Sequence, residues 1–471
     1  MVFIILFEYD NLKPLFQIEF FISSFEIWRF YNLSIFEIGN IKTIMNRNDI
    51  IKANCPIERI GNDKGHHFFG YYNKSVWDCS NRYILANRFN KMVKDVELDD
   101  ELDIGFYDTK INTGKFNKIG STTSWNWQMG NQTQWLDGLN GKKVIYNIRT
   151  NNPSSPYPEF SSRIIDIENG ESQNLPLPVY ITAQNSDYAL SIDYRRLFIT
   201  HETIGYQSKE QYQDMELAPD DDGIYNMNIL LGTYSLICSY QQLKDFHYVS
   251  SMEKATHWVS HIEISPDSKR ILFLHRWSER LEDETCFLHR LISMNPDGSE
   301  MCLLECSDHP LPQLKKSFNA EGVGTFDYEK SEYQISHPTW KNNTQIMVWS
   351  PHKDEIHYHL YDDRSNNVEI IGPNVLTENG HMTYSPDGNW LLSDTYPDDK
   401  TNERILFIYH AETGIRYDVG SFYADPNLGK INRCDLHPRW DMNGTKICID
   451  SVHENERQMY IIDVSAIVTK S

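Results

Sequence analysis

The sequence lacks the features that mark several classes of protein. Basic residues are outnumbered, with 44 Lys and Arg against 66 Asp and Glu, which leaves a formal net charge of -22. Nucleic acids and anionic membranes attract clustered positive charge, so this acidic balance argues against both as partners. A run of about 20 apolar residues is also absent, and the sequence therefore predicts no transmembrane helix.

The eight cysteines are scattered along the chain and show no pattern of paired spacing. They form neither the framework of a disulfide-rich domain nor the CxxC pairs of a zinc site. Cys302 and Cys306 are better explained as two residues on one face of a strand. We therefore expect a reducing, cytoplasmic location, with the periplasm and secretion as alternatives.

Residues 1–44 lack both the pattern of a secretory signal and the pattern of the rest of the chain. Their apolar run is interrupted at Glu8 and Asp10, and no basic residue precedes it. We expect this leader to lie outside the native protein, with translation starting at Met45; an amphipathic element at a membrane surface is the alternative. Residues 45–471 are expected to form a single domain, because no linker divides them.

What the sequence does contain is one repeat, in which a histidine, a polar turn and an apolar strand recur. Each histidine stands three residues before an Ile, Trp or Tyr, and turns such as SPDG, SPDS or DMNG follow. Short strands and such turns, repeated every 45 to 75 residues or so, are typical of a β-propeller with four strands per blade. The four histidines of the repeat are His261, His337, His381 and His437.

Weaker copies of the repeat extend the pattern to nearly the whole chain. They are centred on Trp77, Trp135 and Leu190, and they place Lys74, Gln132 and Asp187 at the histidine position. The sequence thus predicts an all-β fold with seven blades, a six-bladed ring being the alternative. The last blade is one strand short, so we expect an N-terminal strand near residues 55–60 to close the ring.

Four histidines in register change how each of them is interpreted. A single histidine at the start of a strand usually caps a turn or bonds to a neighbouring blade. On consecutive blades, equivalent side chains face a shared channel, and neutral imidazole is the commonest metal ligand near neutral pH. The cluster therefore predicts either a divalent metal site, with Mn, Zn or Ca as the ion, or a metal-free general base whose pKa is lowered by like charges.

Charged residues near the predicted inner strands allow two interpretations. Their arginines could form a basic pocket, or they could pair with acids in a structural network. Near the last blade, Asp435, Asp450 and Glu454 are expected to hold Arg433, Arg439 and the inner-strand histidines in place rather than to act as a hydrolytic pair. The arginines concerned are Arg88, Arg149, Arg196, Arg276, Arg433 and Arg439.

Several longer segments carry a resemblance to known propellers. The segments HHFFGYYNKSVWD, SWNWQMGNQTQWL, GHMTYSPDGNWLLSDTYPD and RCDLHPRWDMNGTKICIDSVHE resemble TolB-like and WD40-like propellers that are described as similar to oligogalacturonate lyases. HMTYSPDG and HPRW also resemble elements of the seven-bladed ulvan lyases. The likeness spans about Gly65 to Val464. It implies cleavage of a uronic-acid polysaccharide or oligosaccharide by β-elimination, in which the uronate carboxylate is neutralised and a base removes the C5 proton.

The resemblance also implies roles for individual residues. Metal ligands in the oligogalacturonate enzymes are His and Gln near the axis, and the ulvan enzymes use Tyr, His and Arg. We therefore expect an acidic saccharide as the partner, and a non-catalytic propeller that binds protein or glycan is the alternative. The expected roles are metal binding by His337, His381 and His437, with His261 as a base or a fourth ligand and Tyr180 as proton donor or acceptor. A carboxylate clamp is expected at Arg196 or Arg439, and substrate contacts by Lys74, Gln132 and Arg276.

Overall fold

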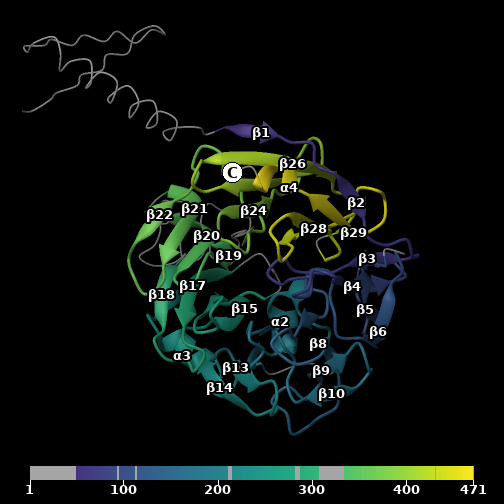
Figure 1. Ribbon diagram of the computed structural model, residues 1–471. Coiled ribbons are helices and arrows are strands. Elements are labelled where there is room, and N and C mark those ends of the chain that lie inside the picture. Colours follow the sequence, from purple (N-terminus) through teal and green to yellow (C-terminus); the bar gives the residue numbers. More distant parts are fainter. Residues whose placement is uncertain are drawn as a thin grey trace, which may run out of the picture. The chain divides into compact units, whose positions relative to one another are not determined.

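The described part of the chain is a ring of seven β-sheets. The computed structural model describes residues 49–92, 95–111, 114–209, 215–281, 287–306, 334–353, 355–429 and 431–469, and the expected leader at 1–44 lies outside them. The sheets stand around a common centre like the blades of a propeller (Figure 1). The prediction of seven blades is confirmed, and the six-bladed alternative is wrong.

The first three blades follow one another along the chain, and each is an antiparallel sheet in sequence order. Blade 1 consists of β3 (His66–Phe68), β4 (Tyr83–Phe89), β5 (Leu102–Asp108) and β6 (Asn117–Thr122). Blade 2 consists of β7 (Gln134–Trp135), β8 (Lys143–Arg149), β9 (Phe160–Asp166) and β10 (Ser172–Leu175). Blade 3 consists of β11 (Ile181–Thr182), β12 (Tyr188–Ser191), β13 (Gly223–Asn228) and β14 (Tyr234–Ser239).

The other four blades repeat this order. Blade 4 consists of β15 (Thr256–Ile264), β16 (Ile271–Ser278), β17 (Leu288–Met294) and β18 (Cys302–Cys306). Blade 5 consists of β19 (Ser336–Trp340), β20 (Gln345–His352), β21 (Glu355–Asp362) and β22 (Val368–Ile370). Blade 6 contains β23 (Thr383–Tyr384), β24 (Trp390–Asp394), β25 (Glu403–His410) and β26 (Ile415–Tyr423), and blade 7 contains β27 (Arg439–Trp440), β28 (Lys446–Ser451) and β29 (Gln458–Asp463).

Two N-terminal strands complete the last two blades. β2 (Ile57–Arg59) pairs antiparallel with β29 as the fourth strand of blade 7, which confirms the predicted closure near residues 55–60. β1 (Ile50–Lys52) adds a fifth strand to blade 6 by pairing parallel with β26. The pairing of β2 with β29 closes the ring, because it supplies the fourth strand that blade 7 would otherwise lack.

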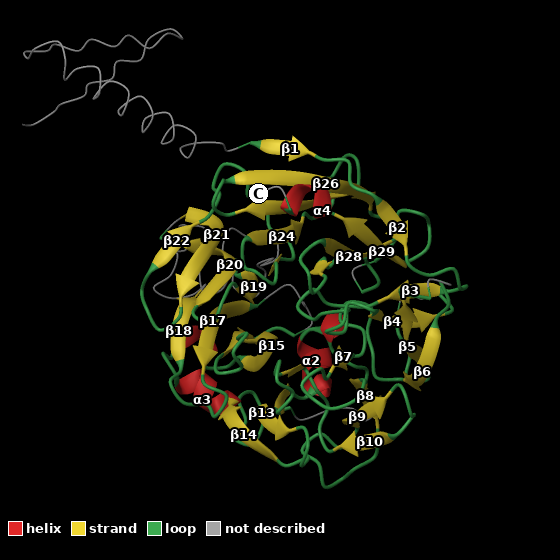
Figure 2. Ribbon diagram, in the orientation of Figure 1, coloured by secondary structure: helices red, strands yellow, loops and turns green. Residues whose placement is uncertain are grey.

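Among the described residues, helices are few and short (Figure 2). They are α2 (Tyr194–Thr200), α3 (Tyr240–Asp245) and α4 (Ser465–Val468), with 3-10 turns η1 (Glu202–Ile204) and η2 (Ser250–Met252). In the part of the chain that the structure describes, no helix is long and apolar enough to cross a membrane.

The repeated turns explain why the strands begin where they do. In the SPDG turn of blade 6, the Ser385 hydroxyl bonds to the Asp387 carboxylate and accepts the backbone N–H of Trp390. Gly388 ends the turn at φ 73°, a conformation that glycine adopts without steric cost. The turn therefore aligns β23 with β24, and the apolar strand that follows packs into the core.

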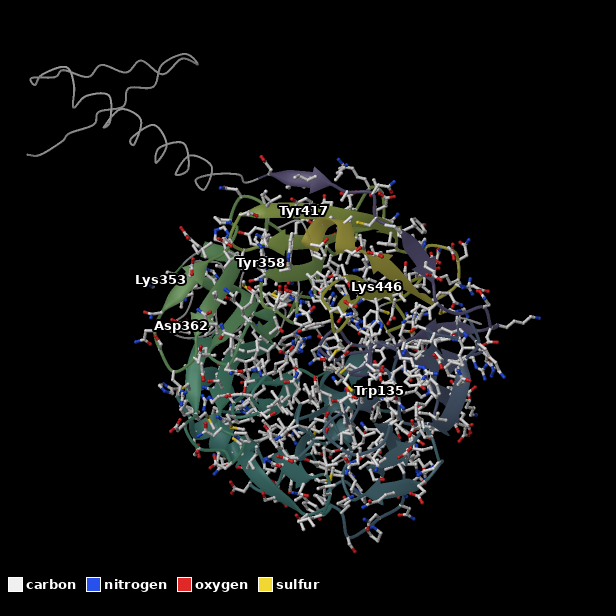
Figure 3. All side chains as sticks on the ribbon, viewed as in Figure 1. Trp135, Lys353, Tyr358, Asp362, Tyr417 and Lys446 are labelled. Carbon is white, nitrogen blue, oxygen red and sulfur yellow. The ribbon has the colours of Figure 1, made fainter. Side chains whose placement is uncertain are left out.

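The core lies between neighbouring sheets. Trp390 and Leu392 of blade 6 are buried together with Trp440 and Ile447 of blade 7. Side chains fill the ring in the same way around its circumference, whereas Lys353 and Asp362 lie at its outer edge (Figure 3). This packing fixes the innermost strands, and with them the residues that face the axis.

Candidate functional site

The histidine position of the repeat has an unusual backbone conformation. Gln132, His261, His337 and His437 have φ angles of 61°, 53°, 51° and 42°. Strand register shifts between Ser260 and Glu263, and again between Ser336 and Thr339, as it does at a β-bulge. Bulges turn side chains away from the regular pleat and are frequent beside functional sites, at a cost of about 1–3 kcal/mol for each non-glycine residue with such a φ.

The four histidines lie close together, as their register predicts. The ring centres of His337 and His381 are 4.2 Å apart, those of His381 and His437 are 4.4 Å apart, and those of His261 and His337 are 5.8 Å apart. Between 2% and 6% of each histidine is exposed. One buried imidazole cluster therefore spans blades 4 to 7.

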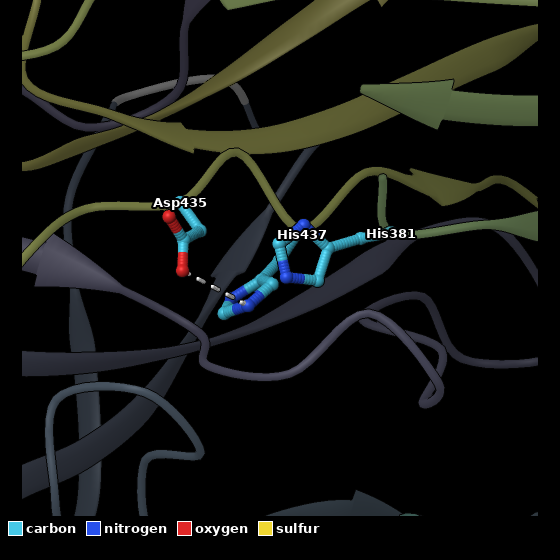
Figure 4. A group of neighbouring side chains, drawn as sticks. All are labelled: His381, Asp435 and His437. Carbon is cyan, nitrogen blue, oxygen red and sulfur yellow. Dashed lines mark ion pairs between the residues drawn. The ribbon is translucent and has the colours of Figure 1, made fainter. Parts of the chain in front are cut away.

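Three side chains of this cluster could hold a metal ion. Ligand atoms of His381, Asp435 and His437 all lie within 4.8 Å of one another, and Figure 4 shows the three groups converging from two adjacent blades. His437 Nε2 is 4.0 Å from a carboxylate oxygen of Asp435, and no described residue forms a hydrogen bond to it. In this group of candidate ligands, Asp435 stands where the sequence analysis expected His337.

His381 is held at its Nδ1 atom by a carboxylate on the side away from the cluster. Its Nδ1 lies 3.0 Å from a carboxylate oxygen of Asp394, which also accepts the backbone N–H of His381 at 2.7 Å. A carboxylate that forms a hydrogen bond with Nδ1 of a ligand histidine orients the ring and leaves Nε2 for the ion. Blade 6 therefore presents an oriented imidazole to the cluster.

The charge states suit a cation. Although burial opposes ionisation, Arg433 and Arg404 hold the pKa of Asp435 well below its usual range, at distances of 2.8 Å and 2.6 Å. Burial, followed by the neighbouring His381, lowers the pKa of both His337 and His437 well below the usual value. Metal ligands must be deprotonated imidazole and charged carboxylate, so these residues fit a divalent metal.

Two tyrosines that the repeat does not include fill the axis. The Tyr71 hydroxyl shares a 2.6 Å hydrogen bond with His261 Nε2, and its ring centre is 5.0 Å from that of His437. The ring of Tyr72 is 5.6 Å from those of both His337 and His381. Neither tyrosine is part of the repeat template, although both lie in the segment HHFFGYYNKSVWD that carries the resemblance, and neither was assigned a role.

Close packing holds the tyrosine segment in place. A Cβ on Gly70, at φ 123°, would lie 2.6 Å from the carbonyl carbon of Met129, so only glycine fits there. Arg439 donates to the carbonyl oxygens of Gly70 and Tyr71 and pairs with Asp450 at 3.1 Å. The expected pairing of Arg439 with an acid of the last blade is confirmed, and this arginine binds backbone rather than facing solvent.

The expected proton-transfer residues lie side by side. The Tyr180 hydroxyl oxygen accepts the backbone N–H of His261 at 2.8 Å, and the Ser260 hydroxyl lies 2.9 Å from His261 Nδ1. Burial raises the pKa of Tyr180 and, with Arg276 next in importance, lowers that of His261. A neutral imidazole and a protonated phenol therefore meet at this bulge.

The remaining expected residues differ in their surroundings. Arg196 lies on α2 and donates to the carbonyl oxygens of His257, Glu216 and Leu217, at 2.7–2.9 Å. Lys74 bonds to Asn73 at 3.0 Å, and burial lowers its pKa to about 7.

Gln132 and Arg276 are both buried. The Gln132 amide lies 3.3 Å from the sulfur of Met129, and the Arg276 guanidinium is 4.5 Å from the ring centre of Phe287. Besides burial, the charge of Arg276 lowers the pKa of His261, whereas Arg196 is bound to backbone. Asp187, aligned with the histidines in the sequence, instead lies exposed in the turn between β11 and β12, so that alignment is wrong.

Comparison with known proteins identifies the architecture. No protein-family model matches the chain, and no curated protein does. A solved oligogalacturonate lyase in complex with manganese is 12% identical and has a TM-score of 0.57, with 87% of this chain and 93% of that chain covered. A second, from Vibrio parahaemolyticus, is 12% identical with a TM-score of 0.53, over 88% and 95% of the two chains. A TolB from Acinetobacter baumannii has a TM-score of 0.37 at 12% identity, over 83% and 82%. The chain is thus similar in fold to oligogalacturonate lyases.

Proposed function

We propose that this propeller binds a divalent metal ion through His381, Asp435 and His437 and cleaves an acidic oligosaccharide by β-elimination. The observation that carries the proposal is the group of three buried side chains whose ligand atoms all lie within 4.8 Å of one another. Two imidazoles favour Mn or Zn over Ca, which prefers oxygen ligands. The similar fold of a lyase in complex with manganese supports Mn as the first ion to test.

A divalent cation, when bound, supplies positive charge that stabilises the carboxylate of a uronate. Among the chain's own groups, Arg433 is placed to share this role, because its side chain is 30% exposed and lies against Asp435. The expected clamps Arg196 and Arg439 bind backbone carbonyl oxygens instead. We therefore assign carboxylate recognition to Arg433.

The proton steps are assigned to Tyr71 and His261. As the Tyr71 oxygen takes the C5 proton, its phenolic proton passes along the 2.6 Å hydrogen bond to His261 Nε2. The C5–H and C4–O bonds break, the C4–C5 double bond forms, and the reverse transfer delivers a proton to the leaving oxygen. Tyr180 supports the pair by accepting the His261 backbone N–H.

The metal part of the proposal is tested by elemental mass spectrometry on protein purified without chelator and incubated with Mn. We expect close to one ion per chain in the wild type and loss of the ion in His437→Ala. His359→Ala is the matched control, because His359 is equally buried on β21 and lies outside the cluster. A His437→Ala protein that keeps its ion would contradict the assignment.

The catalytic part is tested by the absorbance of an unsaturated product from oligogalacturonates and other uronate oligosaccharides. We expect turnover that requires the ion and is lost in Tyr71→Phe while the metal content stays unchanged. Product formation at the wild-type rate in Tyr71→Phe would remove Tyr71 from the mechanism.

One observation favours a second function, the binding of an acidic glycan without cleavage. The four histidines are 2–6% exposed, and Tyr71 and Tyr72 occupy the space between them. Because these side chains fill the site, a ligand would bind at its edge rather than between the histidines. Saccharide binding that depends on the metal but gives no unsaturated product would support this alternative.

A further inference from the structure

One aromatic side chain beside the histidine cluster faces solvent. Tyr396 is 37% exposed, whereas its neighbours His337 and His381 are 5% and 2% exposed. The centre of its ring lies 5.9 Å from that of His381 and 6.4 Å from that of His337. An exposed ring thus adjoins the buried imidazoles.

The backbone around Tyr396 is held firmly. β24 ends at Asp394, the residue that orients His381. Thr395 donates its N–H to Ile405 O and accepts the Ile405 N–H on its hydroxyl, both at 3.0 Å. Pro397 follows and restricts the backbone of Tyr396 to extended conformations. The backbone that carries the ring is therefore held in place before any ligand binds, which lowers the entropic cost of binding.

The ring also adjoins the charged part of the site. The guanidinium carbon of Arg404 is 5.9 Å from the ring centre, and its Nη2 is 2.6 Å from Asp435. One arginine therefore contacts both the aromatic ring and the candidate metal-binding carboxylate. The ring of Tyr396 therefore lies next to the charged groups that surround the candidate metal site.

We propose that Tyr396 is the stacking surface for a pyranose ring of the substrate and so determines which saccharide the site accepts. The inference rests on the proposed function. The C–H faces of a pyranose are apolar and pack on the electron-rich face of an aromatic ring. A few polar groups that fix orientation beside an aromatic wall are also what small-ligand sites usually contain. The ligand class is an acidic oligosaccharide of pyranose units, held flat against Tyr396 with its carboxylate towards Arg433.

Isothermal titration of the Mn-loaded full-length protein with trigalacturonate tests the inference. We expect Tyr396→Ala to weaken binding about tenfold, which corresponds to about 1.4 kcal/mol, while the bound metal and the melting temperature stay unchanged. Tyr396→Phe retains the ring and should bind like the wild type. Tyr423→Ala is the matched control, because Tyr423 is 43% exposed at the end of β26 in the same blade.

The outcomes separate the inference from the proposed function. Wild-type affinity in Tyr396→Ala would overturn the stacking role and leave the metal site and lyase proposal intact. A Mn-loaded wild type that neither binds nor cleaves trigalacturonate would overturn both. Where cleavage is measurable, a stacking role raises KM in Tyr396→Ala far more than it lowers kcat.

Discussion

Asp435 is the residue whose removal should have the largest effect, because its carboxylate serves two purposes. It is one of the three candidate metal ligands, and it neutralises Arg404 and Arg433. Asp435→Asn should therefore abolish metal binding and lower the free energy of unfolding by about 3–5 kcal/mol, since the Arg404 charge stays buried without its partner. Urea unfolding and metal analysis of the same sample measure both effects.

The two effects can be separated. His437→Ala removes a ligand that has no hydrogen-bond partner on Nε2 among the described residues, so it should lose the metal at a smaller cost in stability. Equal destabilisation by the two substitutions would contradict the ion-pair explanation.

His337 tests the strain at the repeat position. At φ 51°, glycine is favoured over any residue with a Cβ, so His337→Gly should be more stable than His337→Ala by about 1 kcal/mol. In a regular strand the order is reversed, because glycine loses more backbone entropy. Thr339, on the same strand and without a positive φ, is the control at which the alanine variant should be the more stable. Thermal unfolding of the four variants decides the matter.

Among single residues, the sequence predicted those that belong to the repeat. The register of His261, His337, His381 and His437 was sufficient to place all four in one cluster. Tyr71 belongs to a segment outside the repeat, and its place at the axis depends on packing around Gly70. Asp435 was assigned to arginine pairing, which the structure confirms, but its closeness to His381 depends on how two blades pack.

At the scale of the element, the same reasoning explains the error in blade 3. The template was centred on Leu190, which lies in the second strand, β12. The innermost strand of blade 3 is β11. Its Thr182, which pairs with Ala189, occupies the place that Trp135 has in blade 2, where Trp135 pairs with Val144. Because β11 has neither the aromatic residue nor the histidine of the repeat, it can be identified only from its strand pairing in the structure. The hairpins of the outer strands could be predicted from the sequences of their turns.

The closing strand β2 gives a prediction at this scale. A chain that begins at Cys55 keeps β2, and we expect it to unfold in one cooperative transition near the full-length melting temperature. A chain that begins at Asp63 lacks β2 and exposes the edge of β29, so it should melt several degrees lower and tend to associate. Calorimetry and sedimentation compare the two. Identical melting temperatures would show that the pairing of β2 with β29 contributes little.

For the whole molecule, buried neutral histidines predict sensitivity to acid. Burial lowers the pKa of His257 to about 3, whereas in the unfolded chain it stays near 6.5. Below pH 6.5 the unfolded state takes up this proton first, so the contribution of His257 to stability is complete above that pH and is lost progressively towards pH 3.

The corresponding measurement compares the slopes of stability against pH. Each such histidine contributes about 1.4 kcal/mol per pH unit within its window. The free energy of unfolding in urea should therefore fall less steeply from pH 6.5 to 4.5 in His257→Gln than in the wild type, by roughly that amount. Nε2 of His275 lies 2.9 Å from Nδ1 of His257, and the amide of the introduced glutamine can take over this hydrogen bond. Parallel slopes in the two proteins would mean that His257 takes up its proton in the native state.

The sharing of blade 7 between the two ends of the chain also has a consequence in time. On the ribosome, β2 is synthesised about 400 residues before β29, the strand with which it pairs. At typical rates of translation this interval lasts roughly 20 to 80 s, during which the growing protein is an open arc of finished blades. Throughout this interval β2 must stay unpaired, so the growing chain is open to chaperones and to pairing with wrong strands until β29 has been made.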